Sequence, residues 1–277
     1  NDKQVKEEIK KEEKYLAKHK GSKEWNAYGG YKNGPKYKAT GHFRVEKIDG
    51  KWWIIDPSGA LFWSSGVNSA GKLNVWTPYL KREHFFEELP KPSDAVYGKF
   101  YGKGYNKNQY NFGLAALHKK YGEFKQYDYT TKSLKRVKSW GLNTFGAWSD
   151  ENVGKYSKDQ RVPYTAYVGT LGIPLNEKFP DVFNPRWKQT VRNRIKAKAN
   201  RLNKDPYFFG YFVDNEMHWY EPITMAQKVL MNPVNKYGKQ ALIDILKEEL
   251  KTIETFNKKT ASHFKSWQDL LNNKSKI

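Results

Sequence analysis

The chain has 277 residues and no cysteine, and its 50 Lys and Arg against 29 Asp and Glu give a formal net charge of +21. The absence of cysteine excludes disulfides, thiolate zinc sites and cysteine nucleophiles. The charge favours a polyanionic partner such as nucleic acid, anionic lipid or an acidic polysaccharide, but a solvated Lys-rich surface explains it equally well. No stretch approaches the roughly 18 apolar residues that would span a bilayer.

Residues 1–40 are predicted to form a segment separate from the main body. Residues 1–20 are charge-dense with apolar residues at loosely helical spacing, which predicts a surface helix. Residues 21–40 are rich in Gly, Tyr and Lys and predict an irregular loop. The chain opens without Met or an apolar signal core, so we expect a mature or recombinant form whose targeting segment has been removed.

A β-hairpin is predicted near the start of the main body, residues 41–277. Apolar runs flank Asp49-Gly50, a pair that supplies the positive φ angles of a tight hairpin turn. Residues 61–68 then predict a buried strand that ends in small and polar residues. Residues 71–130 form a long aromatic and Gly-rich excursion, a length that is uncommon inside a domain unless the loop is functional.

Helices and apolar strands alternate after the excursion. We expect helices from Thr131 to a stop at Gly141, at 183–202 and at 240–256, and strands at 142–147, 161–168 and 207–213. The strands are apolar runs, which predicts a parallel sheet buried on both faces. Such a sheet is either doubly wound or part of a (β/α) barrel, and four βα units are half of an eight-fold barrel.

Polar and aromatic residues follow the strands, where α/β proteins place their sites. The first strand ends at Asn68, the second at Trp148-Ser149-Asp150, and the fourth at Asp214-Asn215-Glu216, followed by His218 and Trp219. Carboxylates, an amide and two Trp at one rim are what a glycosidase requires, namely a proton donor, a positioning hydrogen bond and stacking platforms.

Glu216 is the candidate proton donor. It follows a hydrophobic strand, and enclosure by Tyr211, Phe212 and Trp219 would disfavour its charged form through desolvation. Asn215 does not ionise, so it can hydrogen-bond a sugar hydroxyl without competing for the proton. The alternative interpretation is that Asp214 or Glu216 pairs with one of the many Lys or Arg.

Five motifs occur in a familiar order: DGKWWIIDPSGALFWSSGVN, FFEELP, WGLNTFGAWSD, FPDVFNPRW and DPYFFGYFVDNEMHW. Together they resemble the β-agarase family, glycoside hydrolase family fifty, from about Phe43 to the C-terminus. The resemblance implies a clan-A (β/α)8 barrel of the TIM type. The chain would contain its N-terminal half, preceded by a β-hairpin extension.

The resemblance also implies that Glu216 is the acid/base and that Asn215 contacts the sugar at the subsite being cleaved. The aromatic excursion would lie over the same rim. We therefore expect substrate contacts from the polar and aromatic residues of the rim, namely Asn68, Trp76, Trp148, Ser149, Asn215, His218 and Trp219.

The nucleophile of the clan, a second Glu at the end of strand seven, has no counterpart before Ile277. Retaining chemistry requires two carboxyls about 5–5.5 Å apart, so Glu216 alone is not sufficient. We expect the nucleophile beyond Ile277, in a missing C-terminal half or in a second polypeptide that completes the barrel. A degenerate barrel or fragment that only binds polysaccharide is the alternative.

Other classes of site have no signal in the sequence. The six His lack zinc-binding spacing, and neither a phosphate-binding loop nor a G-x-S-x-G elbow follows a strand, so we expect no metal and no cofactor. Nucleic-acid binding would need a basic stripe interleaved with stacking residues, and none of the usual recognition motifs is present. We expect a secreted, periplasmic or cell-surface hydrolase of a red-algal β-galactan, either agarose or a sulfated galactan such as porphyran or carrageenan, as the basic charge hints.

Overall fold

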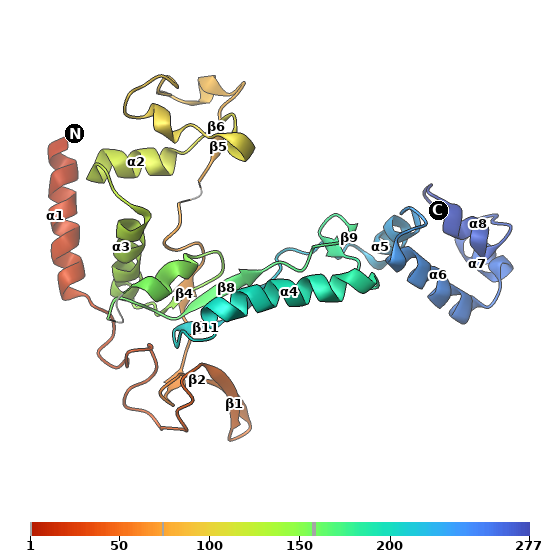
Figure 1. The fold of residues 1–277 in the computed structure, drawn as a ribbon, viewed down its shortest axis with the longest axis horizontal. Helices are drawn as coiled ribbons and strands as arrows, with labels where there is room; N and C mark the ends of the chain where they lie inside the picture. The colour runs from red at the N-terminus through yellow and green to blue at the C-terminus, as the bar shows by residue number, and fades with distance from the viewer. Residues whose placement is uncertain (1, 74, 157–158) are drawn as a thin grey trace. The chain divides into compact units, whose positions relative to one another are not determined.

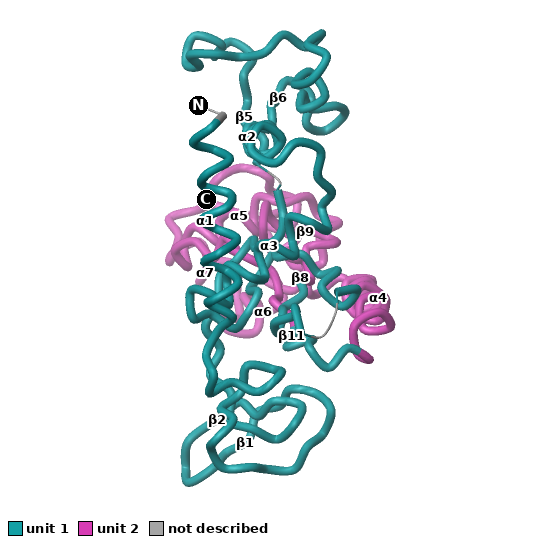
Figure 2. Tube along the Cα trace, turned by 90° about the vertical axis from the view of Figure 1, so that its left-hand side faces the viewer, with its two compact units in different colours: residues 1–166, 205–210 teal, residues 167–204, 211–277 magenta. Residues whose placement is uncertain are grey.

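The computed structural model describes residues 2–73, 75–156 and 159–277 (Figure 1). Its contacts divide the chain into two compact units, coloured in Figure 2. Unit 1 contains residues 1–166 and 205–210, and unit 2 contains residues 167–204 and 211–277. In the parts of the chain that are described, no helix is long and apolar enough to cross a membrane.

Unit 1 begins with the predicted surface helix, α1 (Asp2–Lys18), which contacts α3 (Gln126–Ser139). Arg136 of α3 forms an ion pair with Glu12 at 2.6 Å, and the Tyr121 hydroxyl donates to Glu12 at 2.9 Å. Burial acts to raise the pKa of Glu12, but the hydrogen bonds from Arg136 and Tyr121 outweigh it and lower the pKa below its ordinary value. An ionised Glu12 therefore holds α1 in place.

The predicted hairpin is confirmed. Strands β1 (Arg44–Ile48) and β2 (Lys51–Ile55) pair antiparallel, with Ile48 opposite Lys51. Asp49 has a φ of 48° and Gly50 a φ of 78°, the left-handed pair that this turn requires. The turn forms as expected because its geometry depends on two adjacent residues.

The single strand predicted at 61–68 is wrong, since the structure has two short strands there. Strand β3 (Leu61–Phe62) pairs antiparallel with β2, whereas β4 (Gly66–Val67) pairs in parallel with β7 (Thr144–Phe145). Between them, the buried Asn143 side chain accepts a hydrogen bond from Ser65 N at 2.9 Å and donates one to Trp63 O at 2.9 Å. One side chain thus satisfies the backbone where the chain passes from one sheet to the other.

The excursion at 71–130 is only partly irregular, and position 74 within it lies outside the described residues. Its described residues contain three 3-10 turns, a two-stranded sheet and a helix, namely η1 (Glu83–Phe85), η2 (Gly98–Phe100), η3 (Gly104–Asn106), β5 (Thr77–Pro78), β6 (Gln109–Tyr110) and α2 (Phe112–Tyr121). They also include the start of α3, which begins at Gln126, before the predicted start at Thr131. Phe100, Tyr110 and Ala115 form a small core that other aromatic residues cover. The segment is ordered because its aromatic side chains bury one another.

A four-stranded sheet with the order β11-β8-β7-β4 carries the predicted strand ends. Strands β4, β7 and β8 (Tyr164–Val168) pair in parallel. Tyr164 N donates to Tyr207 O at 3.1 Å and Asp214 N to Val168 O at 3.0 Å, so β11 (Phe208–Val213) runs in the same direction as β8. The α/β class is confirmed. Within the described residues, the four strands lie in the order in which they occur along the chain.

Strand β11 is more exposed than its apolar sequence predicts. Phe212 is 37% exposed and Val213 58% exposed. In the sheet formed by the described residues, the strand is the last in the order and pairs with β8 alone. Burial on both faces, the basis of the prediction, depends on covering elements that the strand's own sequence does not specify.

Unit 2 contains the hairpin of β9 (Pro174–Asn176) and β10 (Phe179–Pro180), and the helix α4 (Pro185–Leu202), which Asn184 caps as predicted. Four further helices share a core of Leu230, Ile243, Ile253, Phe256 and Leu270, namely α5 (Pro222–Leu230), α6 (Tyr237–Leu250), α7 (Ile253–Thr260) and α8 (Trp267–Asn272). The one helix predicted at 240–256 is two helices. Lys251 leaves α6 with a φ of 63°, and the Thr252 hydroxyl accepts the Thr255 N–H at 3.2 Å to cap α7.

Candidate active site

The loop that follows β11 is anchored by Asp214. Its carboxylate accepts the Thr170 N–H at 2.6 Å and also the Thr170 hydroxyl. The Trp187 indole N–H of α4 donates to Thr170 O at 3.0 Å. Asp214 therefore joins the ends of β8 and β11, and its oxygens are already engaged.

Three residues of this loop have left-handed backbone angles. The φ angles are 53° at Asp214, 48° at Glu216 and 53° at Tyr220. Non-glycine residues rarely adopt this conformation, which costs of order 1–3 kcal/mol for each and persists only where the surroundings impose it. Such strain at the end of a parallel strand suggests a functional loop, because it aims side chains in directions that a relaxed chain would not take.

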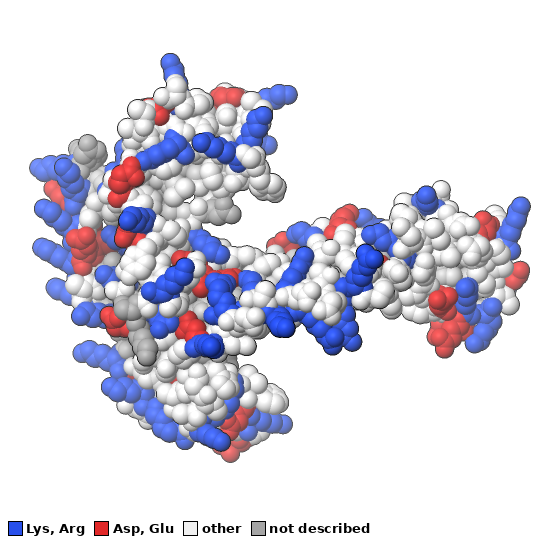
Figure 3. Space-filling model, viewed as in Figure 1, with Lys and Arg blue, Asp and Glu red and all other residues white. Residues whose placement is uncertain are grey.

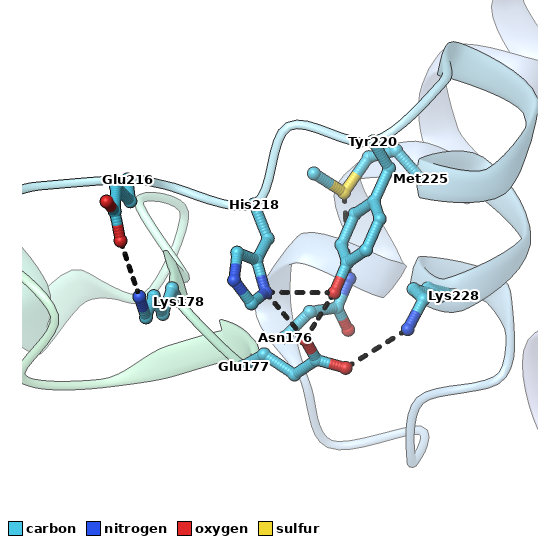
Figure 4. A network of polar contacts seen from close by, with 8 residues as sticks. All are labelled: Asn176, Glu177, Lys178, Glu216, His218, Tyr220, Met225 and Lys228. Carbon is cyan, nitrogen blue, oxygen red and sulfur yellow. Dashed lines mark hydrogen bonds and ion pairs between the residues drawn. The ribbon is translucent and has the colours of Figure 1, made fainter.

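Glu216 lies on this loop, but the enclosure predicted for it is wrong. Its side chain is 76% exposed, and its nearest recorded partner is Lys178, with Nζ at 3.5 Å from Oε2 (Figure 4). Phe212 and Trp219, which were expected to cover it, are themselves 37% and 66% exposed. Among the described residues, β11 is the last strand in the sheet order. The pairing with a Lys matches the alternative interpretation, although an exposed pair of this length contributes little.

A polar network centred on Glu177, in the turn of the β9–β10 hairpin, holds the second half of the loop (Figure 4). Glu177 Oε2 lies 2.6 Å from His218 Nδ1 and accepts the Tyr220 hydroxyl, while Oε1 accepts Lys228 Nζ at 3.1 Å. Hydrogen bonds from Tyr220, His218 and Lys228 lower the pKa of Glu177 to about 2. The same bond to Glu177 raises the pKa of Tyr220.

The hairpin residues Glu177 and Lys178 thus contact His218, Tyr220 and Glu216 in turn. Neither hairpin residue was identified from the sequence, because nothing in 174–180 indicates which distant loop it meets. The acidic-basic pair in a short turn before Phe179-Pro180 was the available signal. Trp219 packs edge-on against Phe179 of the same hairpin, with ring centroids 5.0 Å apart.

In unit 1, hydrogen bonds join the segments that follow β4 and β7. Ala70 N donates to the Ser149 hydroxyl at 3.0 Å, and Asp150 N donates to Ala70 O at 2.9 Å. Ser149 is only 1% exposed, so its hydroxyl serves this contact. A Cβ on Gly146 would lie 2.2 Å from the Asn68 side-chain oxygen, which places Asn68 directly against β7.

The remaining predicted residues of unit 1 are Trp148, Trp76 and Asp150. Trp148 is half-buried with a left-handed φ of 59°, and Trp76 is half-buried just before β5. Asp150 is buried and accepts the Thr130 hydroxyl at 2.7 Å, which gives it a structural role. The structure therefore brings Asn215, Glu216, His218 and Trp219 together on one loop of unit 2, and Asn68, Trp148 and Ser149 to neighbouring strand ends of unit 1.

Solved structures of agarases share this α/β fold. The crystal structure of an agarase, AgWH50C, matches with a TM-score of 0.76 at 24% identity, over 99% of this chain and 44% of that chain. The structure of PfGH50B matches with a TM-score of 0.78 at 23% identity, over 100% of this chain and 46% of the other. An exo-β-agarase matches with a TM-score of 0.69 at 22% identity, over 97% and 45%. The fold is thus one that agarases have.

The curated relatives are β-agarases of Vibrio sp. (strain JT0107). β-Agarase B is 28% identical over 293 residues, covering 87% of this chain and 30% of that protein, and β-agarase A is 28% identical over 202 residues, covering 62% and 19%. No family model matches the chain. The resemblance to the β-agarases of glycoside hydrolase family fifty, predicted from the motifs, is confirmed, and the chain spans less than a third of the length of either curated relative.

Proposed function

We propose that the chain is part of a β-agarase-type glycoside hydrolase and supplies its acid/base residue, Glu216. The observation that carries the proposal is the position of Asn215-Glu216, on a strained and anchored loop after the fourth parallel strand. The likeness to β-agarases over most of the chain supports a red-algal β-galactan as the substrate, with agarose as the first candidate.

The proposed mechanism is retaining. Glu216 gives its proton to the glycosidic oxygen as the C–O bond breaks, and that bond's electron pair stays on the leaving oxygen. A second carboxylate attacks the anomeric carbon, and Glu216 then takes a proton from the water that releases the sugar. Asn215 would hydrogen-bond a sugar hydroxyl, and the exposed ring of Trp219 would stack on a sugar face.

The second carboxylate is proposed to come from outside residues 1–277, either from a further part of the same protein or from a second polypeptide. Within unit 2, Asp214 and Glu177 are unsuited to the role because their oxygens already accept hydrogen bonds. Residues 41–277 would then be the N-terminal portion of a (β/α)8 catalytic barrel, with 1–40 as an N-terminal helix and loop. A polymeric substrate supports action in a secreted, periplasmic or cell-surface location.

The test measures the release of reducing ends from agarose. It compares unaltered protein with the Glu216→Gln variant, both for this chain and for the full natural protein. Loss of the proton donor should lower the rate by about 10²–10⁴-fold. Glu221→Gln is the matched control, because Glu221 is an exposed carboxylate at the end of the same loop and makes no capping hydrogen bond. Undiminished activity in the Glu216 variant would contradict the assignment of Glu216 as the acid/base.

The alternative is a polysaccharide-binding fragment or degenerate barrel without catalysis. The exposed ring of Trp219 supports it, because an aromatic surface can bind sugar without a catalytic acid. Binding of agaro-oligosaccharides without release of reducing ends, by this chain and by the full protein alike, would decide for this alternative.

A further inference from the structure

One helix of unit 2 carries a third of the chain's net positive charge of +21. Helix α4 has seven Lys and Arg and no acidic residue in its 18 positions, PRWKQTVRNRIKAKANRL. Helix α1, by contrast, interleaves six Lys with five acidic residues. Lys and Arg side chains follow α4 in the space-filling view (Figure 3). A uniform Lys-rich bias does not explain a helix from which acids are absent.

Three of these cations lie in line. Lys188, Arg192 and Lys196 follow one another at intervals of four residues, so they share one side of the helix, and all three are exposed. In the described parts of the chain, no carboxylate pairs with any of them. Like charges four residues apart destabilise a helix by about 0.2–0.5 kcal/mol per pair. The row, hereafter the α4 cationic face, is therefore unfavourable for the isolated helix.

The first turn of α4 has the same character. Arg186 and Lys188 lie there, and the turn contains no acidic residue, although the positive end of the helix dipole disfavours cations. The other side of α4 is anchored by hydrogen bonds to backbone carbonyls, from the Trp187 indole to Thr170 O at 3.0 Å and from Arg194 to Gly169 O at 2.8 Å. These contacts hold the helix, so the α4 cationic face is not needed for folding.

We propose that the α4 cationic face binds an anionic, sulfated polysaccharide. The inference rests on the proposed function, and it adds a binding surface on α4, outside the loop that carries Glu216. The three side chains are about 6 Å apart along the helix, as four residues at 1.5 Å each require. A linear polyanion with sulfate groups along its length can contact all three cations, whereas a compact anion contacts at most two adjacent ones.

The composition of the face disfavours two of the other polyanions, single-stranded nucleic acid and an anionic lipid surface. Single-stranded nucleic acid is bound by cations interleaved with stacking aromatics, but Trp187 is the one aromatic residue of α4 and its indole N–H bonds to Thr170 O. A helix that lies on a lipid surface needs a broad apolar face. Apart from Ile195, which is 38% exposed, the exposed positions of α4 are predominantly polar or charged.

The experiment compares two triple variants of the 277-residue chain with the same change in charge and spacing. Lys188→Gln/Arg192→Gln/Lys196→Gln alters the α4 cationic face, and Lys6→Gln/Lys10→Gln/Lys14→Gln alters a row of equal spacing on α1. Circular dichroism checks that both fold. Titration calorimetry with carrageenan fragments and with neutral agaro-oligosaccharides of matched length measures binding, at about 50 and 200 mM salt. Duplex DNA, single-stranded DNA and vesicles containing phosphatidylglycerol serve as competing polyanions.

The α4 variant should bind carrageenan fragments about tenfold more weakly and with a smaller salt dependence, while the α1 variant should stay within about twofold of the unaltered chain. Equal losses in both variants would mean that net charge alone is responsible and would overturn the proposal. Tighter binding of DNA or vesicles than of carrageenan would overturn the choice of partner. If Glu216→Gln does not lower activity but the α4 variant still binds carrageenan more weakly, the proposed catalysis is rejected and the proposed binding surface stands.

Discussion

At the scale of single residues, Glu177 is the most perturbed group of the candidate site. Its carboxylate gathers His218, Tyr220 and Lys228 from two elements of unit 2, and its pKa falls to about 2. The hydrogen bonds favour the ionised form, so the arrangement of the loop depends on that charge. Glu216, by contrast, depends on the loop for its position.

A dependence on pH follows from the lowered pKa of Glu177. The ionised form is favoured in the folded chain, so its contribution to stability is complete above the ordinary value of 4.5 and is lost as the pH falls towards about 2. Hydrogen exchange of residues 214–220, corrected for intrinsic rates, should rise across this window. Glu177→Gln should exchange fast at every pH, and the Glu221→Gln control should behave like the unaltered chain. A loop that stays protected down to pH 2 in the unaltered chain contradicts the prediction.

The identity of the residues on the loop could be predicted from the sequence. Asn215 and Glu216 follow a long apolar run, and His218 and Trp219 come directly after them. Their surroundings could not be predicted in this way. The partners Glu177, Lys178 and Thr170 are about 40 residues away in the chain, and their contacts depend on how the hairpin folds back.

At the scale of elements, the parallel sheet depends on close backbone approach at β4. A Cβ on Gly66 would lie 2.0 Å from Thr144 O, its partner in the ladder. By contrast, a Cβ on Gly210 in β11 would meet nothing within 4 Å. The two glycines therefore differ in the space available for a side chain, although both lie in strands of one sheet.

Gly66→Ala should destabilise unit 1 by about 2–4 kcal/mol, because the backbone must move to admit the methyl group. Gly210→Ala is the matched control and should change stability by less than about 1 kcal/mol in either direction. Denaturant unfolding followed by circular dichroism measures both variants. Equal effects of the two substitutions would show that the approach of β4 to β7 is not tight.

Elements governed by neighbouring residues were predicted well. The β1–β2 hairpin follows from Asp49-Gly50, and the start of α4 follows from Asn184-Pro185. The strand expected at 61–68 failed because its halves have different partners, β2 and β7. The helix expected at 240–256 failed because the Lys251 backbone turns left-handed between two otherwise apolar helical faces.

At the scale of the whole molecule, the C-terminal helices of unit 2 have a core of their own. Leu134 is fully buried in unit 1, and Phe256 belongs to the core of the C-terminal helices in unit 2. Local cores of this kind allow parts of a chain to open with different free energies. A single unfolding transition is therefore not expected.

Phe256→Ala should destabilise the C-terminal helices by about 3–5 kcal/mol, through lost burial and the cavity that remains. Leu134→Ala, at about 2–5 kcal/mol, should act on unit 1 instead. Hydrogen exchange with peptide resolution distinguishes them, since each variant should lose protection in its own unit. Loss of protection throughout the chain from either substitution would mean that the units unfold together.

The sequence by itself determined the α/β class, the resemblance to β-agarases and the residues that lie at the strand ends, because apolar runs, turns and motifs are written in neighbouring positions. Only the tertiary structure decided that Glu216 is exposed beside Lys178, that Glu177 holds the loop, and that α4 presents an uncompensated row of cations. These features depend on which distant segments meet and which faces stay uncovered. Strand pairing and packing against other elements decide which segments meet and which faces stay exposed, and neither can be read from neighbouring residues.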